Sequence, residues 1–484
     1  MYLLNQIEKN SVDTPNKVCI SNEDASLTFQ EFWDISQDFS NFLINNKKNR
    51  NIVVSILESN TFYDYVAMVG TLIAGGTYVP INSKTPLKKI IKIVKSSKSN
   101  YLFSIKKNKK FFKNMKNIFF YENIKKQNIF NKKKIIHNKI AYIIFTSGST
   151  GDPKGVKISR KSLDHYIKWL IKKIRLNKNC KISQFPSISF DLSVADIYLS
   201  LCGGYNLVPV NNNFFNFFPA DFIQSNKIEH LTCTPTLIDL IIRSNTLSKT
   251  KLKSLKSIFF CGEPLMKYHL EKIFKMNPNL KVINCYGPTE ATVSVTYVNL
   301  NLSNYYKLVN DQNVTIGKSI KGMKLCFIKD GRLSKNEGEL LIAGPQLSEG
   351  YIQNELNKKR FKLINKINYY LTGDIGFKKN NNYFVLGRND SQVKYKGHRI
   401  ELDEITNILR KKLTKNIFTT IYKKKLISFI EGQKKDKSKL LKYLSLYLES
   451  YKLPDDIIFL KNFMVNKNGK TDIKKTIIKY EKEF

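Results

Sequence analysis

The stretch AYIIFTSGSTGDPKGVKIS, residues 141–159, decides how the rest of this 484-residue sequence is interpreted. An apolar, β-like run leads into six small residues, which are Thr146, Ser147, Gly148, Ser149, Thr150 and Gly151. Glycines let backbone N–H groups converge on an anion, hydroxyls donate further hydrogen bonds, and Lys154 adds a positive charge. The stretch therefore predicts a phosphate-binding loop. It is not a Walker A loop, because Gly155 rather than Ser or Thr follows Lys154.

Short β-branched runs alternate with helical stretches on both sides of this loop. The runs are residues 51–56, 77–81, 141–145 and 256–260. This alternation predicts an α/β fold with mainly parallel sheets. Residues 387–400 are rich in Gly, Asn, Asp and charged side chains, which indicates a domain junction, and the remainder of the chain has small α+β character.

The composition excludes several classes of protein. Hydrophobic residues make up 42% of the chain, too many for a disordered protein, and the length excludes a small disulfide or zinc module. Seven scattered cysteines without a CxxC pair indicate neither a disulfide framework nor a zinc site, and favour a reducing compartment. The net charge of +42 would attract nucleic acid, anionic membranes or acidic proteins, but lysines are spread everywhere, as compositional drift would produce.

Targeting and membrane signals are absent from the sequence. Glu8 interrupts the apolar run that a secretory signal would need. The longest uncharged stretch, residues 65–81, contains three glycines and a proline, and is a poor candidate for a membrane span. We therefore expect a cytoplasmic enzyme with no membrane span and no specific nucleic-acid partner.

The phosphate loop resembles the signature of the adenylate-forming superfamily, which includes acyl-CoA synthetases and the adenylation domains of peptide synthetases. Further motifs follow in the family's order and span nearly the whole chain, at residues 72–82, 190–201, 284–293, 338–351, 370–376, 387–405 and 466–472. The resemblance implies a large N-terminal part of two α/β subdomains plus a β subdomain, residues 1–387. It also implies a small mobile α+β C-terminal domain, residues 388–484, with a hinge at Asp390.

The implied reaction is attack of a carboxylate on the α-phosphate of ATP, which releases pyrophosphate and forms an acyl-adenylate. Because two anions must meet, catalysis has to come from positioning and from positive charge near the phosphates. The resemblance gives each nucleotide-site residue a role. The adenine would stack on Tyr286, and Gly287 would also contact the nucleotide. Thr289 would contact the α-phosphate, and Glu290 would bind Mg²⁺. Asp374 would bind the ribose, Arg388 would also contact the nucleotide, and Lys470 would bridge the reacting groups.

Asp191 indicates which class of carboxylic acid is activated. Amino-acid-activating members of the superfamily have an acid at this position, and a buried carboxylate suits the ammonium group of an amino acid. The alternative is that Asp191 caps a helix beginning at Leu192. By the family's pattern, the remaining residues of the amino-acid pocket are Leu192, Ala195, Cys261, Cys285, Val293 and Ser294.

Among amino-acid activators the motifs are most similar to those of D-alanine:carrier protein ligases. Two departures leave another amino acid open: Ala195 replaces a bulkier methionine and Cys285 replaces a threonine. An acyl-CoA synthetase, and a lysine-rich nucleic-acid or membrane binder without catalysis, also remain as alternatives. The resemblance implies transfer to the phosphopantetheine thiol of an acidic carrier protein. We expect that carrier to be a separate protein, because the chain ends shortly after Lys470.

Overall fold

The computed structural model describes residues 1–23, 25–46, 51–105, 118–124, 137–146, 152–210, 213–244, 246–390, 392–413, 416–433, 435–464 and 473–481. The chain forms two compact units, and its main division falls between Asn389 and Asp390. The large unit contains residues 1–83, 94–145 and 155–389. The small unit contains the C-terminal segment together with residues 84–93 and 146–154.

A nine-stranded sheet forms the centre of the large unit. Its inner strands are parallel, and the outer strands β2, β14 and β17 are antiparallel to their neighbours. The order across the sheet is β17 (Lys318–Ser319), β14 (Thr296–Leu300), β13 (Lys281–Tyr286), β12 (Ser257–Phe260), β11 (His230–Cys233), β9 (Lys181–Gln184), β10 (Asn206–Pro209), β1 (Val18–Ser21) and β2 (Ser26–Thr28).

A second sheet of six strands carries the predicted phosphate loop at the end of β7. Strands β6, β5, β3, β4 and β7 pair in parallel. The order is β6 (Ile118–Phe120), β5 (Tyr101–Ser104), β3 (Val53–Leu57), β4 (Thr77–Ile81), β7 (Ile140–Thr146) and β8 (Lys154–Ser159). Both parallel sheets, and all four strands expected from the β-branched runs, agree with the predicted α/β fold.

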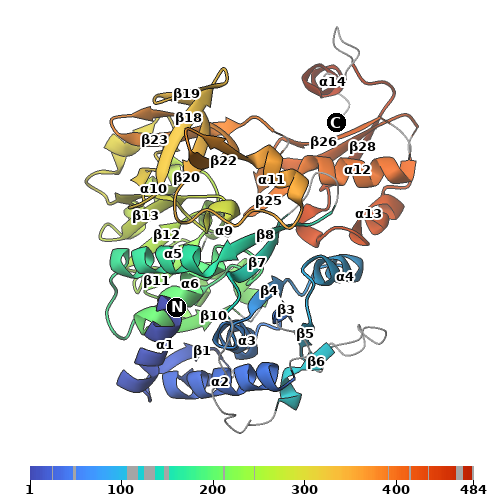
Figure 1. Cartoon of the computed structure of the whole chain (residues 1–484). Helices are drawn as coiled ribbons and strands as arrows, with labels where there is room; N and C mark the ends of the chain where they lie inside the picture. Colours follow the sequence, from blue (N-terminus) through green and yellow to red (C-terminus); the bar gives the residue numbers. More distant parts are fainter. Residues whose placement is uncertain are drawn as a thin grey trace. The chain divides into compact units, whose positions relative to one another are not determined.

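A third, antiparallel sheet forms the β-rich part of the large unit (Figure 1). Its strands are β19 (Arg332–Ser334), β18 (Lys324–Lys329), β20 (Glu337–Ala343), β22 (Ile367–Lys379), β21 (Phe361–Ile364) and β23 (Asn382–Arg388). A separate short pair is formed by β15 (Val309–Asn310) and β16 (Asn313–Val314). The long strand β22 contains Asp374, so the sheet fixes the backbone of a predicted ribose-binding residue.

The helices of the large unit follow the local sequence closely. Helix α2 begins with a capping box, in which the Thr28 hydroxyl accepts from the Glu31 N–H and the Glu31 carboxylate accepts from the Thr28 N–H. Helix α6 is buried along its length and ends at Gly204, whose φ is +72°. The helices are α1 (Tyr2–Asp13), α2 (Phe29–Asn45), α3 (Phe62–Ile73), α5 (Arg160–Lys173), α6 (Ser193–Gly203), α7 (Asn213–Phe217), α8 (Pro219–Asn226), α9 (Pro235–Arg243), α10 (Lys267–Met276) and α11 (Asn354–Arg360), with 3₁₀ turns η2 (Tyr121–Asn123), η3 (Thr289–Ala291) and η4 (Tyr305–Leu308).

The small unit is an α+β structure, as expected. A hairpin of β24 (Gln392–Tyr395) and β25 (His398–Glu401) precedes a three-stranded sheet of β26 (Ile417–Tyr422), β27 (Lys425–Glu431) and β28 (Asp456–Leu460). Its helices are α12 (Leu402–Leu413), α13 (Lys437–Ser445), η5 (Ser450–Lys452) and α14 (Ile473–Tyr480). Helix α4 (Leu87–Ser96) starts in this unit and passes into the large unit after Ile93.

Four buried charges pack together in the small unit. The Lys89 ammonium lies 2.8 Å from a Glu449 carboxylate oxygen and 3.4 Å from a Glu404 oxygen. The Lys452 ammonium lies 3.0 Å from an oxygen of each carboxylate. We call these four residues the ion quartet. Every charge of the quartet has two opposite neighbours, so removing any one of them would leave buried charge incompletely paired.

Across the residues that the structure describes, no helix is both long and apolar enough to span a membrane. This agrees with the interpretation of residues 65–81, which form most of α3, a glycine turn and β4. Gly75 has a φ of +78° in that turn.

Candidate active site

The predicted amino-acid-binding residues lie at the carboxyl ends of neighbouring strands of the nine-stranded sheet. Asp191 and Leu192 follow β9, Cys261 directly follows β12, and Cys285 lies next to the end of β13. Ligands of open α/β sheets bind at this edge. Five of the predicted residues belong to one buried cluster: Leu192, Ala195, Cys261, Cys285 and Val293. The structure therefore brings together residues that are up to 101 positions apart in the sequence.

Asp191 lies immediately before the buried helix α6. Only 6% of the residue is exposed. The helix begins at Ser193 with Leu192 as its N-cap, so the capping position of the alternative interpretation is not held by Asp191. Its charge acts on two buried tyrosines. Burial raises the pKa of Tyr142 and of Tyr166, and the negative charge of Asp191 raises both further.

The two cysteines of the predicted pocket face the same buried region. The Cys261 thiol donates to the Val293 carbonyl oxygen at 3.6 Å. Burial raises the pKa of the Cys285 thiol, and Cys261 adds to this shift. The Cys285 thiol is therefore neutral near pH 7, and both buried cysteines present small side chains to this region. Ser294 is also fully buried and lowers the pKa of Cys285 slightly.

The turn after β13 has a strained backbone. Thr292 and Val293 both adopt left-handed conformations, with φ of +57° and +68°, which β-branched residues rarely do. Gly287 is required here, because a Cβ atom would lie 2.5 Å from the Cα of Ser294. The buried Gln346 amide supports the turn by donating to the Ser294 carbonyl oxygen at 2.7 Å, and the Thr292 hydroxyl donates to the Gln346 carbonyl oxygen at 2.7 Å.

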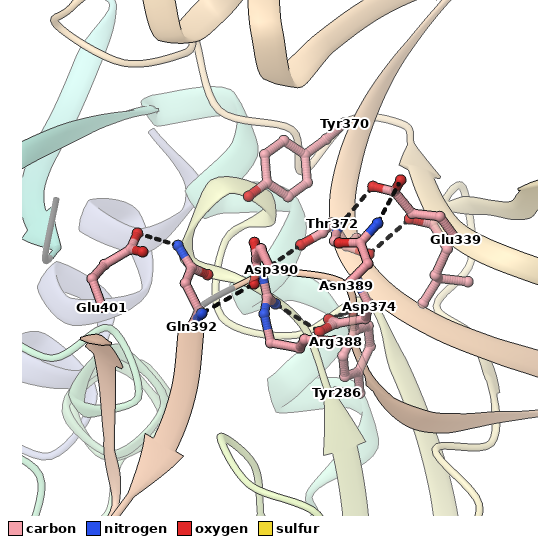
Figure 2. Close-up of polar contacts among 12 residues, drawn as sticks. Tyr286, Glu339, Tyr370, Thr372, Asp374, Arg388, Asn389, Asp390, Gln392 and Glu401 are labelled. Atoms are coloured by element: carbon pink, nitrogen blue, oxygen red, sulfur yellow. Dashed lines mark hydrogen bonds and ion pairs between the residues drawn. The ribbon is translucent and has the colours of Figure 1, made fainter. Parts of the chain in front are cut away.

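Three predicted nucleotide-binding residues converge within the large unit, as Figure 2 shows. The Tyr286 hydroxyl donates to Asp374 Oδ2, and Arg388 lies 2.6 Å from Asp374 Oδ1. Burial and the neighbouring carboxylate of Asp374 raise the pKa of Tyr286. Arg388 also donates to the Thr372 carbonyl oxygen at 3.0 Å. One carboxylate is thus held between an aromatic hydroxyl and a guanidinium.

The backbone beside Asp374 is fixed by a second carboxylate. Glu339 accepts from the Gly373 N–H at 2.9 Å and from the Asn389 side-chain amide at 3.3 Å (Figure 2). The Asn389 N–H donates to the Gly373 carbonyl oxygen at 2.9 Å. Gly373 itself has a φ of +77°, a conformation that favours glycine.

Glu290, the predicted magnesium ligand, is 2% exposed and lies in the short turn η3 with Thr289. Its carboxylate accepts from the Tyr351 hydroxyl at 2.5 Å, and that hydroxyl lies 3.4 Å from the Tyr370 hydroxyl. Among the described residues no group of three or more His, Cys, Asp or Glu side chains is arranged to hold a metal ion. A single carboxylate fits Mg²⁺ only if phosphate oxygens supply most of the ligands.

In the small unit, Lys154 forms an ion pair with Glu401 at 2.7 Å, and Glu401 also accepts from the Gln392 amide (Figure 2). An ammonium has three donors, so Lys154 can keep this pair and still contact a phosphate. Asp390 Oδ1 accepts from the Gln392 N–H at 3.2 Å. Thr146 ends β7, whereas Ser147–Gly151 and Lys470 lie outside the described residues.

Sequence reasoning gave no role to several residues that shape this site. Glu339, Gln346 and Tyr351 all lie in the motif at 338–351, which was recognised only as part of the resemblance. Their side chains bond to Gly373, Ser294 and Glu290, respectively. The only sequence signal for these three residues is that their motif stands in the order expected of the family. Their hydrogen-bond partners can be identified only from the fold.

Comparison with known proteins agrees with this geometry. Residues 7–352 match the family model described as AMP-binding enzyme. A D-alanine–D-alanyl carrier protein ligase from Bacillus cytotoxicus is 30% identical, with 99% of each chain covered, and one from Bacillus cereus is 29% identical with the same coverage.

Solved structures give the same result. The Vibrio cholerae adenylation domain AlmE in complex with glycyl-adenosine-5'-phosphate has a TM-score of 0.85 and 25% identity, covering 99% of this chain and 97% of that chain. The fused adenylation-PCP di-domain NpsA-ThdA from Klebsiella oxytoca has a TM-score of 0.82 and 20% identity, covering 94% and 93%, and shows the fold alone. This chain belongs to the AMP-binding enzyme family, which uses ATP, and is an AMP-forming ligase.

Proposed function

We propose that this enzyme activates a small amino acid with ATP and loads it onto the phosphopantetheine thiol of a carrier protein. The observation that carries the amino-acid assignment is Asp191, a buried acid that follows β9 of the parallel sheet and raises the pKa of the buried Tyr142 and Tyr166. A carboxylate in that setting suits the ammonium group of an amino acid better than the chain of a fatty acid. Relatives named as D-alanyl carrier protein ligases support the same class.

The first step joins a substrate carboxylate oxygen to the α-phosphorus of ATP and breaks the bond to pyrophosphate. Asp374 is suited to bind the ribose, because each oxygen has a second lone pair besides the one taken by Tyr286 or Arg388. Glu290 and the Thr289 hydroxyl would lie beside the phosphates, where Glu290 would hold Mg²⁺. The ion would neutralise phosphate charge during attack.

The phosphate loop, Lys154 and Lys470 would supply donors and positive charge to the same phosphates. We further propose that the small unit moves about a hinge at Asp390, so that Lys470 serves adenylation and then withdraws. In the second step the carrier thiol attacks the acyl carbon, forming a thioester and releasing AMP. The thiol's proton leaves to solvent.

The carrier would approach as an acidic protein, since the net charge of +42 favours association with anions. We propose a cytoplasmic location, because the enzyme uses ATP as a substrate. The seven cysteines make no disulfide in the structure. No specific nucleic-acid binding is proposed, because the proposed activity gives it no role.

The residues of the predicted pocket favour a second candidate substrate. Ala195 and Cys285 are smaller than the methionine and threonine of the D-alanine ligases, so they leave more space beside Cys261. A substrate other than alanine is therefore the second candidate. Its mechanism would be the same.

The test is amino-acid-dependent ATP–pyrophosphate exchange with purified enzyme. The panel contains D- and L-alanine, glycine, serine, cysteine and larger amino acids, with acetate and a fatty acid as controls. We expect exchange with one small amino acid and none with amine-free acids. Exchange driven only by amine-free acids would contradict the proposal. Free coenzyme A in place of a carrier then separates an acyl-CoA synthetase from a carrier-loading ligase.

A further inference from the structure

One buried carboxylate next to the proposed active site has not been given a role. Glu58 directly follows strand β3 of the six-stranded sheet, and 6% of the residue is exposed. Its oxygens accept from three donors: the Ile188 N–H at 3.0 Å, the Ser187 hydroxyl at 2.8 Å and the Asn82 side-chain amide at 3.0 Å. Two of these donors lie in the segment between β9 and α6 that leads to Asp191.

That segment, residues 185–190, is a turn whose hydrogen bonds reach Ser193, the first residue of α6. The Phe190 N–H donates to the Ser187 carbonyl oxygen at 2.9 Å, and the Ser193 N–H donates to the Phe190 carbonyl oxygen at 3.0 Å. The Ser193 hydroxyl donates to the Ile188 carbonyl oxygen at 3.4 Å. A displacement of Ile188 would therefore pass directly to the start of α6 and to Asp191.

Glu58 ties this turn to the other parallel sheet. Its own N–H donates to the Ile81 carbonyl oxygen at 2.9 Å, which fixes its backbone to the end of β4. Asn82, the next residue, bonds both Glu58 and the Ser187 hydroxyl, the latter at 3.0 Å. The carboxyl ends of β3 and β4 thus hold the turn that leaves β9. Three donors meet one buried carboxylate, and two of them lie in the turn, which makes this a stiff clamp.

We propose that Glu58 is a positioning residue that fixes the 185–190 turn and thereby the direction of the Asp191 carboxylate toward the substrate's ammonium group. The inference rests on the proposed function, since it assigns Asp191 to amino-acid binding. It assigns Glu58 no contact with substrate. Its effect should appear in the recognition of the amino acid and not in the recognition of ATP.

The test compares Glu58→Gln, Asn82→Asp and the double variant. Glu58→Gln places a new amide donor against the Asn82 amide, and Asn82→Asp places two carboxylates together. In the double variant the donor and acceptor are exchanged, so the pair can bond again. In pyrophosphate exchange we expect each single variant to raise the amino-acid KM about tenfold, as for the loss of one buried hydrogen bond, with the ATP KM nearly unchanged. The double variant should recover most of the loss.

Asp164→Asn is the matched control. Asp164 is a partly buried carboxylate of the large unit that accepts from the Tyr2 N–H at 2.9 Å and from the Leu3 N–H at 3.1 Å, at the start of α1. It should lower the melting temperature without changing the ratio of the two KM values. If Glu58→Gln raised both KM values equally, or left both unchanged, the positioning role would be wrong.

A second readout does not require any activity. Hydrogen exchange of the Ile188 amide, whose bond is to Glu58, should be at least about tenfold faster in Glu58→Gln than in the wild type, and should be slowed again in the double variant. An unchanged Ile188 exchange rate would overturn the clamp itself. A wild-type enzyme with a protected Ile188 amide but no amino-acid-dependent exchange would instead overturn the proposed function.

Discussion

Buried charge is used differently in the two units of this enzyme. In the small unit, Lys89 and Lys452 pair with the two carboxylates of the ion quartet, and Lys154 pairs with Glu401. In the large unit, the cluster around Asp374 uses one arginine together with the Tyr286 hydroxyl and backbone groups. Although lysine dominates the composition, the contacts described around Asp374 in the large unit are made without it. Net charge is therefore a poor guide to this site, and the two regions should respond differently to mutation.

The largest expected effect is on the stability of the small unit. Lys452→Met would leave Glu404 and Glu449 sharing Lys89 alone, with their remaining charge buried. We expect the free energy of unfolding of this unit to fall by about 3–5 kcal/mol, as when one partner of a buried ion pair is removed. Hydrogen exchange of amides in β26–β28 during urea titration measures it.

The matched control is Lys437→Met. Lys437 lies 2.8 Å from Asp456, but the two side chains are 47% and 44% exposed. An exposed pair contributes less than about 1 kcal/mol. Equal losses in the two variants would mean that the quartet contributes no more than a surface ion pair.

Asp374→Ala should cause a large loss of activity with ATP. Removing an acceptor of charged hydrogen bonds costs about 3 kcal/mol, or about a hundredfold in kcat/KM for ATP. Pyrophosphate exchange at saturating amino acid measures this effect. The amino-acid KM should change little, and an equally large rise in it would place Asp374 outside the proposed ribose site.

Gln346→Ala sharpens the comparison inside the large unit. Its amide supports the strained turn at Thr292 and Val293, which forms part of the predicted amino-acid site. We expect the amino-acid KM to rise about tenfold, the effect of leaving a buried carbonyl without its donor. His165→Ala, which removes only the contact of 3.0 Å to the Gln346 side chain, should have a smaller effect in the same direction.

Acid should weaken the small unit in two successive steps. Burial lowers the pKa of His398 to about 4, below its ordinary 6.5. The contribution of the neutral imidazole to the free energy of unfolding is therefore lost as the pH falls from 6.5 to 4. The pKa of Glu449 is lowered to about 2 from 4.5: burial opposes ionisation, but Lys452 and Lys89 favour it more strongly. The stability that ionised Glu449 contributes above pH 4.5 is therefore lost as the pH falls toward 2.

Each group changes by at most one proton, so each step is limited to about 1.4 kcal/mol per pH unit. Urea midpoints from pH 8 to 3 measure the slope. His398→Phe should flatten only the first step and Glu449→Gln only the second. A free energy of unfolding that rose as the pH fell below 4.5 would contradict this prediction.

The sequence predicted much of the fold because the decisive signals were local. The β-branched runs at 51–56, 77–81, 141–145 and 256–260 became β3, β4, β7 and β12. The predicted amino-acid residues met because parallel strands end at one edge of a sheet. For these features no long-range information was needed.

The supporting contacts were beyond such reasoning. Glu58 and Ile188 are 130 positions apart, and Gln346 and Ser294 are 52 apart, so no periodicity connects them. The left-handed Thr292 and Val293 contradict the local preference of β-branched residues. The membership of residues 84–93 and 146–154 in the small unit also depends on tertiary contacts alone.

The most direct measurement is pyrophosphate exchange with two matched substrates, D-alanine and its amine-free counterpart propionate, for the wild type and for Asp191→Asn. The account predicts exchange of the wild type with the activated small amino acid, tested with glycine and serine if D-alanine is inactive, and none with propionate. It predicts a loss of at least about a hundredfold in amino-acid kcat/KM for Asp191→Asn, from removal of a buried charge pair. Equal use of amine-bearing and amine-free acids by the wild type, or an Asp191→Asn variant with unchanged kcat/KM, would contradict amino-acid activation through Asp191.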